Sequence, residues 1–348
     1  MWKTVGQQRI IALLEHSIKN KEPAHAYLII GPPHVGKMTL AIDFAQAINC
    51  EGSQPPCKEC QTCKKIAEGK HADVIVIEGI EDASSETKAG SEISINEIKT
   101  LQHSASLPPY EGRYKVFIIN GAESLSHEAA NCLLKTLEEP PPHVIFVLLT
   151  SSESQVLPTI ISRCQRLELK PLASEEVSKI LTTLYGLDDQ KARLLSGLAQ
   201  GCPGWAINAV LDSTVLAQRA QFIQEMFSLL EATWGERLTY AAKLAANRTS
   251  AEQALRNWLS CWRDIMLIKN GYKEAVVNLD YLDTLVSLSQ RLNIAEVRRF
   301  IESMGKSLAY TATNANLRLI MEVALLNMPR LKNRAEALWH TSTTSTQG

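Results

Sequence analysis

A glycine-rich segment near the start of the chain has the residue types and spacing of a phosphate-binding loop. It reads Gly-Pro-Pro-His-Val-Gly-Lys-Met-Thr and lies between a short apolar run and a helical pattern. Glycines let backbone N–H groups turn toward phosphate oxygens, and Lys37 can reach the outer phosphates of a nucleotide. The alternative is an ordinary glycine-rich turn between a strand and a helix. The residues expected to bind nucleotide here are Gly31, Gly36, Lys37 and Thr39.

The groups that nucleotide hydrolysis needs are incomplete. Such loops carry Ser or Thr directly after the lysine to hold Mg²⁺, but Met38 stands there and Thr39 follows about 100° further around the helix. Hydrolysis also needs two carboxylates at the end of a later strand, one for Mg²⁺ and one to polarise water. Here that strand ends in Asn120 and Gly121, and Glu123 is displaced to a place where we expect it to be solvated. We therefore expect ATP or ADP to bind with absent or very weak turnover.

Four of the eight cysteines are clustered in the spacing Cys-x6-Cys-x2-Cys-x2-Cys. Four thiolates suit tetrahedral Zn²⁺, and two-residue gaps let neighbouring thiolates face one ion. Consecutive two-residue gaps also occur in iron–sulfur proteins, so iron is the competing metal, and free thiols are the third interpretation. Four ligands leave no open position, so we expect a structural metal in a compact, exposed module. The predicted zinc ligands are Cys50, Cys57, Cys60 and Cys63.

Strands and helices alternate over the first 170 residues and must position these groups. Fully apolar strands with helices between them argue for a parallel sheet that is covered on both faces. We expect strands at 26–30, 73–77, 114–119, 144–150 and 165–169, and helices at 10–18, 37–48, 95–104 and 126–137.

Proline and glycine usage divides the rest of the chain. Thirteen of the fourteen prolines lie at or before Pro203, and the following stretch is rich in residues that favour helices. The expected organisation is an α/β domain at 1–170 with the zinc module at 50–63, a helical lid at 171–210, an all-helical domain at 211–335, and a disordered tail at 336–348.

Composition excludes several classes of protein. Of 348 residues, 45% are hydrophobic and the net charge is −1, so general disorder and a global positive field for nucleic acid are excluded. The longest apolar runs fall far short of the roughly 20 residues of a membrane helix. The first residues lack the apolar core of a signal peptide, so we expect a cytoplasmic protein without a membrane partner.

Together these motifs resemble the AAA+ clamp-loader family of bacterial DNA replication, from Val5 to about Ala209. The similarity includes the four cysteines and three further segments. These segments are His25-Ala26-Tyr27-Leu28 before the loop, Ala129–Pro141, and Ser162-Arg163-Cys164. The resemblance implies a P-loop AAA+ domain with a small helical lid and an all-α C-terminal domain.

Departures from the family's motor subunit favour the delta-prime branch over the gamma/tau branch. Motor subunits have Thr or Ser where Met38 stands, Asp-Glu at Asn120-Gly121, and an Arg at the place of Trp205. Thr150 occupies the family's sensor-1 place and so joins the nucleotide-binding set. Arg163 is retained, and the resemblance implies that it acts as an arginine finger on a neighbouring subunit's ATP. The alternative is that Arg163 is a structural residue that pairs with a nearby acidic side chain.

The resemblance implies a role in the DNA polymerase III holoenzyme. Gamma/tau and delta subunits would join this chain in a hetero-pentamer that loads the sliding clamp onto primer-template DNA. The C-terminal helices would join the collar of that ring. Two alternatives remain: an active gamma/tau-like ATPase, and a stand-alone DNA-binding AAA+ module, for which the C-terminal region has only a weak excess of basic residues.

Overall fold

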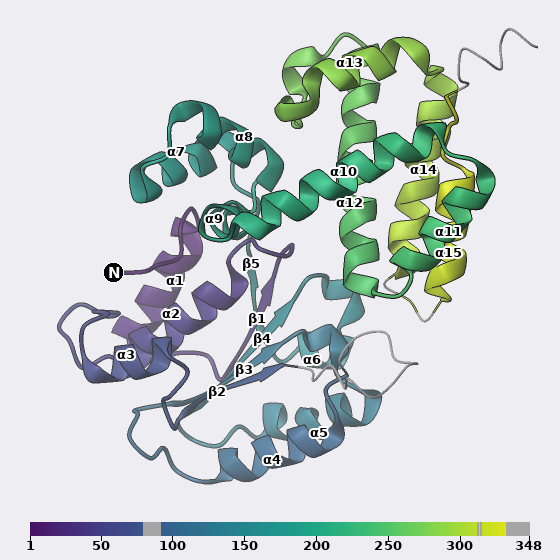
Figure 1. Cartoon of the computed structure of the whole chain (residues 1–348). Coiled ribbons are helices and arrows are strands. Elements are labelled where there is room, and N and C mark those ends of the chain that lie inside the picture. Colours follow the sequence, from purple (N-terminus) through teal and green to yellow (C-terminus); the bar gives the residue numbers. More distant parts are fainter. Residues whose placement is uncertain (79–91, 312, 314, 332–348) are drawn as a thin grey trace, which may run out of the picture. The chain divides into compact units, whose positions relative to one another are not determined.

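The computed structural model describes residues 1–78, 92–311, 313 and 315–331 (Figure 1). The chain forms two compact units, Met1–Ile207 and Asn208–Gly348. Each unit has a hydrophobic core of its own. The tail predicted at 336–348 lies outside the described residues, as does the end of the predicted helical domain.

The first unit is built on a parallel sheet of five strands in the order β2-β3-β4-β1-β5. Its strands are β1 (Ala26–Ile30), β2 (Val74–Glu78), β3 (Lys115–Asn120), β4 (Val144–Thr150) and β5 (Gln165–Glu168). Ile30 lies opposite Thr150, and Asn120 lies opposite Leu149. The carboxyl ends of β1, β3 and β4 therefore meet at one edge, where parallel sheets bind their ligands.

Helices cover both faces of this sheet (Figure 1). Alternate residues of β1 point to opposite faces, so Ile29 packs with Phe44 of α2, and Leu28 packs with Leu101 of α4 and Leu133 of α5. The helices of this part are α1 (Gln8–Lys19), α2 (Lys37–Asn49), α3 (Gln61–Ala67), α4 (Ile95–Ser106), α5 (His127–Glu138) and α6 (Pro158–Ile161).

Three helices follow the last strand. They are α7 (Ser174–Tyr185), α8 (Asp189–Ala199) and α9 (Pro203–Leu211). The α7 and α8 helices pack against each other, and Asp188 caps α8 by accepting a hydrogen bond from the Lys191 backbone. Gly186, with φ +65°, ends α7 in the left-handed conformation that glycine favours. One short connection, from Gly186 to Asp188, thus folds α8 back onto α7.

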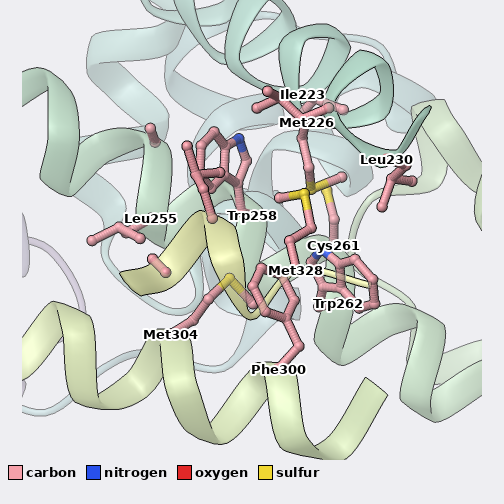
Figure 2. Packing of buried hydrophobic residues seen from close by; sticks show 14 of the residues in the cluster. Ile223, Met226, Leu230, Leu255, Trp258, Cys261, Trp262, Phe300, Met304 and Met328 are labelled. Atoms are coloured by element: carbon pink, nitrogen blue, oxygen red, sulfur yellow. The ribbon is translucent and has the colours of Figure 1, made fainter. Parts of the chain in front are cut away.

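The second unit is all helical in its described part, and its core is rich in aromatic and sulfur-containing side chains (Figure 2). Trp258 and Trp262 of α12 are completely buried, and the Trp262 ring lies 4.7 Å from the ring of Phe300 in an edge-on arrangement. Such a contact adds stability beyond the burial of area. The helices are α10 (Ser213–Glu231), α11 (Trp234–Leu244), α12 (Arg248–Lys269), α13 (Leu282–Arg291), α14 (Ile294–Thr311) and α15 (Leu317–Leu326).

The predicted fold class is confirmed in the arrangement of its elements: a parallel α/β sheet domain, followed by helices and an all-helical C-terminal part. The predicted strands agree with the observed ones to within one residue at each end. The main difference is α3, a seven-residue helix inside the cysteine cluster that the sequence analysis did not predict. Within the described ranges, no helix has the length and apolar character needed to cross a membrane.

Candidate nucleotide site and metal centre

The glycine-rich loop connects β1 to α2, as a phosphate-binding loop requires. Gly36 has φ +108°, which an L side chain rarely adopts, and an added Cβ there would meet no atom within 4 Å. The Lys37 ammonium donates hydrogen bonds to the carbonyl oxygens of Gly31 (2.6 Å) and Pro32 (3.0 Å). The turn at Gly36 therefore has open space beside it. The Lys37 side chain folds back onto the start of the loop, where it binds the carbonyl oxygens of Gly31 and Pro32.

A cavity of about 490 Å³ lies in front of the loop and is lined by four segments of the chain. Among the predicted nucleotide-binding residues, Gly36, Lys37, Thr39 and Thr150 line it, whereas Gly31 contributes its carbonyl oxygen to Lys37 instead. The full lining is Pro33, His34, Gly36, Lys37, Met38 and Thr39 of the loop, Asn120, Gly121, Glu123, Leu149, Thr150 and Ser151 of the sheet edge, and Gly204.

The first turn of α9 touches the glycine-rich loop directly. The Gly204 N–H donates a hydrogen bond of 2.9 Å to the carbonyl oxygen of His34, and a Cβ at Gly204 would lie 2.7 Å from the same oxygen. Glycine is therefore required for this close approach. Trp205, at the place of the family's sensor arginine, is half-buried and does not line the cavity within the described part of the chain.

Charge in the cavity comes mainly from Lys37 and Glu123. Burial lowers the pKa of Lys37 below its ordinary value, while the negative charge of Glu123 acts in the opposite direction. A partly buried ammonium beside a helix N-terminus is suited to an anion. The cavity volume, the open turn at Gly36 and this ammonium fit the phosphates of a nucleotide.

The sequence analysis placed Glu123 in solvent, and this was wrong. Gly121, with φ +86°, starts a 3₁₀ turn (Ala122–Ser124) that returns Glu123 to the cavity wall. Its Oε1 accepts hydrogen bonds from the Ser151 backbone N–H (3.2 Å) and hydroxyl (2.9 Å). Asn120 donates from Nδ2 to Glu78 Oε1 at 2.9 Å. Asn120 and Gly121 themselves offer no carboxylate, as predicted from their residue types.

Arg163 lies just after α6, away from the residues that line the cavity. Its guanidinium donates to Glu138 Oε1 at 2.6 Å and to the Thr159 carbonyl oxygen at 2.9 Å. The side chains of Arg163 and Glu138 are 33% and 50% exposed, so solvent screens this ion pair and its contribution to stability is small. Arg163 is therefore paired with a local acid, Glu138, as the structural interpretation of this residue expects, but the ion pair does not hold Arg163 tightly.

The four clustered cysteines converge on one point. The sulfur atoms of Cys50, Cys57, Cys60 and Cys63 all lie within 4.8 Å of one another, a geometry that could hold a metal ion. Three of the sulfurs accept backbone N–H groups: Gly52 and Cys57 to Cys50, Cys60 to Cys57, and Cys63 to Cys60 at 3.3–3.4 Å. Such N–H donors stabilise thiolate ligands.

Protonation of the cluster is uneven. Backbone N–H groups of Cys60 and Glu59 lower the pKa of Cys57 to about 6, whereas burial raises the pKa of Cys63 far above its ordinary value. Without a cation, the buried thiols stay protonated at neutral pH. A divalent ion would supply the charge that allows all four to ionise. Cys50 and Cys63 are buried and Cys57 and Cys60 are half-buried, whereas much of the surrounding module is exposed, as predicted.

The cysteine cluster is anchored to α2, the helix that begins at Lys37. Buried Asp43 of α2 accepts hydrogen bonds from the Thr4 backbone and hydroxyl, and it pairs with Lys58 of the cysteine loop. The Gln46 side chain donates to the Cys63 carbonyl oxygen at 2.6 Å. The phosphate loop and the cysteine cluster are therefore attached to the two ends of one helix.

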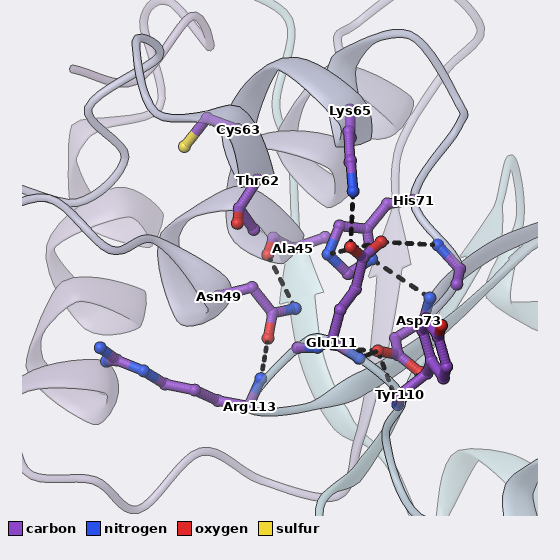
Figure 3. Close-up of polar contacts among 12 residues, drawn as sticks. Ala45, Asn49, Thr62, Cys63, Lys65, His71, Asp73, Tyr110, Glu111 and Arg113 are labelled. Atoms are coloured by element: carbon purple, nitrogen blue, oxygen red, sulfur yellow. Dashed lines mark hydrogen bonds and ion pairs between the residues drawn. The ribbon is translucent and has the colours of Figure 1, made fainter.

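The loop before β3 is held by the end of α2 and by Asp73, which precedes β2 (Figure 3). Buried Asp73 accepts backbone N–H groups of Tyr110, Glu111 and Gly112 at 2.8–3.0 Å. Asn49, the last residue of α2, accepts the next two backbone N–H groups at 2.8 and 2.9 Å. Burial alone would raise the pKa of Asp73, but these donors outweigh it and lower the pKa below its ordinary value.

Comparison with known proteins identifies the family. A model described as DNA polymerase III, delta subunit, matches residues 6–173, and a second model, for the C-terminal part of the same delta subunit, matches residues 213–329. The delta' subunit of Bacillus subtilis (strain 168) is 28% identical over 338 residues, which are 93% of this chain and 97% of that protein.

Tau subunits are similar as well, but the chain spans less than two thirds of their length. The tau subunit of Bacillus subtilis is 29% identical over 96% of this chain and 62% of that protein. The tau subunit of Escherichia coli (strain K12) is 37% identical over 58% of this chain and 30% of that protein. The matched residues include both the loop domain and the C-terminal helices, and the chain belongs to the DNA polymerase III clamp-loader family.

Proposed function

We propose that the chain is a delta-prime-like subunit of the clamp loader in the cytoplasmic DNA polymerase III holoenzyme, and that it does not itself turn over ATP. The observation that carries this proposal is the cavity beside the phosphate loop. It has the loop and Lys37, but Asn120 and Gly121 replace the two carboxylates that hydrolysis needs at the end of β3. The delta' relative, which this chain spans almost completely, supports the same role.

Nucleotide binding without turnover follows from this chemistry. Gly36, Lys37, Thr39 and Thr150 line a cavity large enough for nucleotide phosphates, and Gly31 lies at the base of the loop. Binding requires only the loop amides and the ammonium, whereas hydrolysis also requires charge stabilisation of the transferring phosphoryl group. ATP or ADP would therefore act as a bound structural ligand.

Arg163 would act in trans. It does not line this chain's own cavity, which supports a role at the nucleotide of a neighbouring subunit. Its partner Glu138 is half exposed, so exchange of that screened ion pair for a phosphate costs little. A phosphate accepts two parallel N–H bonds from the planar guanidinium, which an ammonium cannot supply.

The proposed partners are gamma/tau and delta subunits in a hetero-pentamer, with the sliding clamp and primer-template DNA bound by the complex. The helical region from residue 211 onward, which matches the family model for the end of the delta chain, would form this chain's share of the collar. Residues 171–210 would act as the lid, because Gly204 touches the phosphate loop.

We also propose that the cysteine cluster binds one structural Zn²⁺. Four convergent sulfurs with N–H donors suit zinc in a closed tetrahedral site. The zinc module would fix the C-terminal end of α2, the helix whose N-terminal end follows the glycine-rich loop. It supplies no open coordination position and hence no catalytic role.

An assembly and turnover experiment tests the proposal. The chain is mixed with the gamma/tau and delta homologues of its own genome, and the mass of the complex is measured by light scattering after size-exclusion chromatography. A stable hetero-oligomer that needs this chain is expected, with background ATP hydrolysis by the chain alone. Turnover abolished by Lys37→Ala would instead favour an active gamma/tau-like ATPase, and a chain that remains alone would contradict the clamp-loader role.

A further inference from the structure

The carboxylate of Glu123 is held in the cavity with one oxygen unused. Ser151 donates two hydrogen bonds to Oε1, which fixes the orientation of the group. Oε2 is buried from solvent, and no group in the described residues donates a hydrogen bond to it. An unpartnered buried carboxylate oxygen is costly, so its partner is expected to be a ligand.

The protein's own cation does not satisfy this oxygen. Lys37 lines the same cavity, but its ammonium is bonded to the carbonyl oxygens of Gly31 and Pro32. An ionised carboxylate only accepts hydrogen bonds or binds cations. The missing partner is therefore a donor or a cation that enters the cavity from solution.

The other polar groups of the cavity indicate which cation fits. Asn120 uses its amide nitrogen on Glu78, which leaves Oδ1 as an acceptor, and Thr39, which carries a hydroxyl, also lines the cavity. Carboxylate, amide and hydroxyl oxygens are ligands of Mg²⁺, which also binds substrate phosphates and keeps several waters. A site of this composition suits a magnesium ion that arrives with a nucleotide.

We propose that Glu123 binds the Mg²⁺ of a magnesium–nucleotide complex, in place of the carboxylate that is absent at Asn120. This inference rests on the nucleotide binding proposed above. Glu123 is the one acidic side chain among the described cavity-lining residues, so no second carboxylate remains to polarise water. The site would hold the metal with the nucleotide and still lack the group that turns over ATP.

Binding of a fluorescent N-methylanthraniloyl ADP to the full chain tests this role, with excess MgCl₂ and, separately, with EDTA. The parent is expected to bind at least about tenfold more tightly with Mg²⁺, and Glu123→Gln to lose most of that gain. In EDTA the variant should bind as well as the parent or better, because a negative charge near the phosphates is removed. That unchanged affinity also shows that the variant is folded.

Matched controls separate the inference from the function on which it rests. Glu128→Gln, on the exposed first turn of α5, should keep the full Mg²⁺ gain. Equal Mg²⁺ gains in Glu123→Gln and the parent would overturn the metal role, as would binding by the parent that Mg²⁺ does not change; both leave nucleotide binding intact. No binding in either condition would overturn the nucleotide site and the metal role together.

Discussion

Arg237 offers the sharpest test of how the C-terminal unit is stabilised. Its side chain is completely buried, and burial lowers its pKa below the ordinary value, yet it remains charged. The guanidinium lies 5.2 Å from the centre of the Trp234 ring. It donates to backbone carbonyl oxygens at the ends of α10 and α15, which are those of Leu229, Leu230, Leu325, Met328 and Pro329.

Replacement of this residue, Arg237→Met, keeps most of the aliphatic stem and removes every donor. Three of the bonds are 2.6–3.1 Å long, and a bond to a charged donor contributes about 1.5–3 kcal/mol. The cost of burying the charge disappears as well, so we expect a net loss of about 3–5 kcal/mol. That is a large share of the roughly 5–15 kcal/mol that stabilises a domain.

Urea unfolding of the full chain, monitored by hydrogen exchange and mass spectrometry, shows which of the two units loses stability. Peptides from α10, α11 and α15 should unfold at a midpoint lowered by roughly 2 M, given a slope of about 2 kcal/mol per molar. Peptides of the sheet should not change. The control Arg318→Met removes an exposed ion pair with Glu322 and should cost less than about 0.5 kcal/mol. A loss for Arg237→Met as small as this control would refute the reasoning.

Three further changes test other parts of the account. Because the folded-state pKa of Asp73 is lowered, its stabilisation is present above about pH 4 and is lost as the pH falls below that value. Asp73→Asn should therefore lower the urea midpoint at pH 7 and flatten the loss of stability in acid. Metal analysis after purification without added metal should give about one zinc per chain for the parent and Cys132→Ser, and none for Cys63→Ser. In Gly204→Ala the added Cβ would lie only 2.7 Å from the His34 carbonyl oxygen, so it should displace the loop and weaken nucleotide binding several-fold by fluorescence titration. Gly235→Ala should have no such effect, because a Cβ at Gly235 would meet no atom within 4 Å.

The sequence predicts the sheet and its loop well, because their signals are local. The strands β1 to β4 are short, largely apolar runs, and the glycine-rich loop follows β1 directly. The cysteine cluster is also local, so its convergence on one point was predicted from spacing. The α3 helix was missed because its start is capped by the sulfur of Cys60 rather than by an ordinary capping residue.

The parts of the site that were missed depend on contacts between distant segments. Glu123 reaches the cavity through a left-handed turn at Gly121 and two bonds from Ser151, none of which is encoded by periodicity. The contact of Gly204 with the loop joins residues that are far apart in the chain. A glycine at position 121 was a usable signal for a turn that redirects the next residues.

The ATPase rate of the reconstituted complex with primed DNA and the sliding clamp tests the central claim most directly. Arg163→Ala should leave assembly intact and remove the contribution of the adjoining ATP site, because an arginine finger is worth roughly 10³–10⁵ in rate at its site. Arg163→Lys should rescue little, since it lacks the planar fork. Arg166→Ala, which removes an exposed ion pair close by, should match the parent. A complex that assembles with Arg163→Ala and hydrolyses ATP at the parent rate would contradict the account.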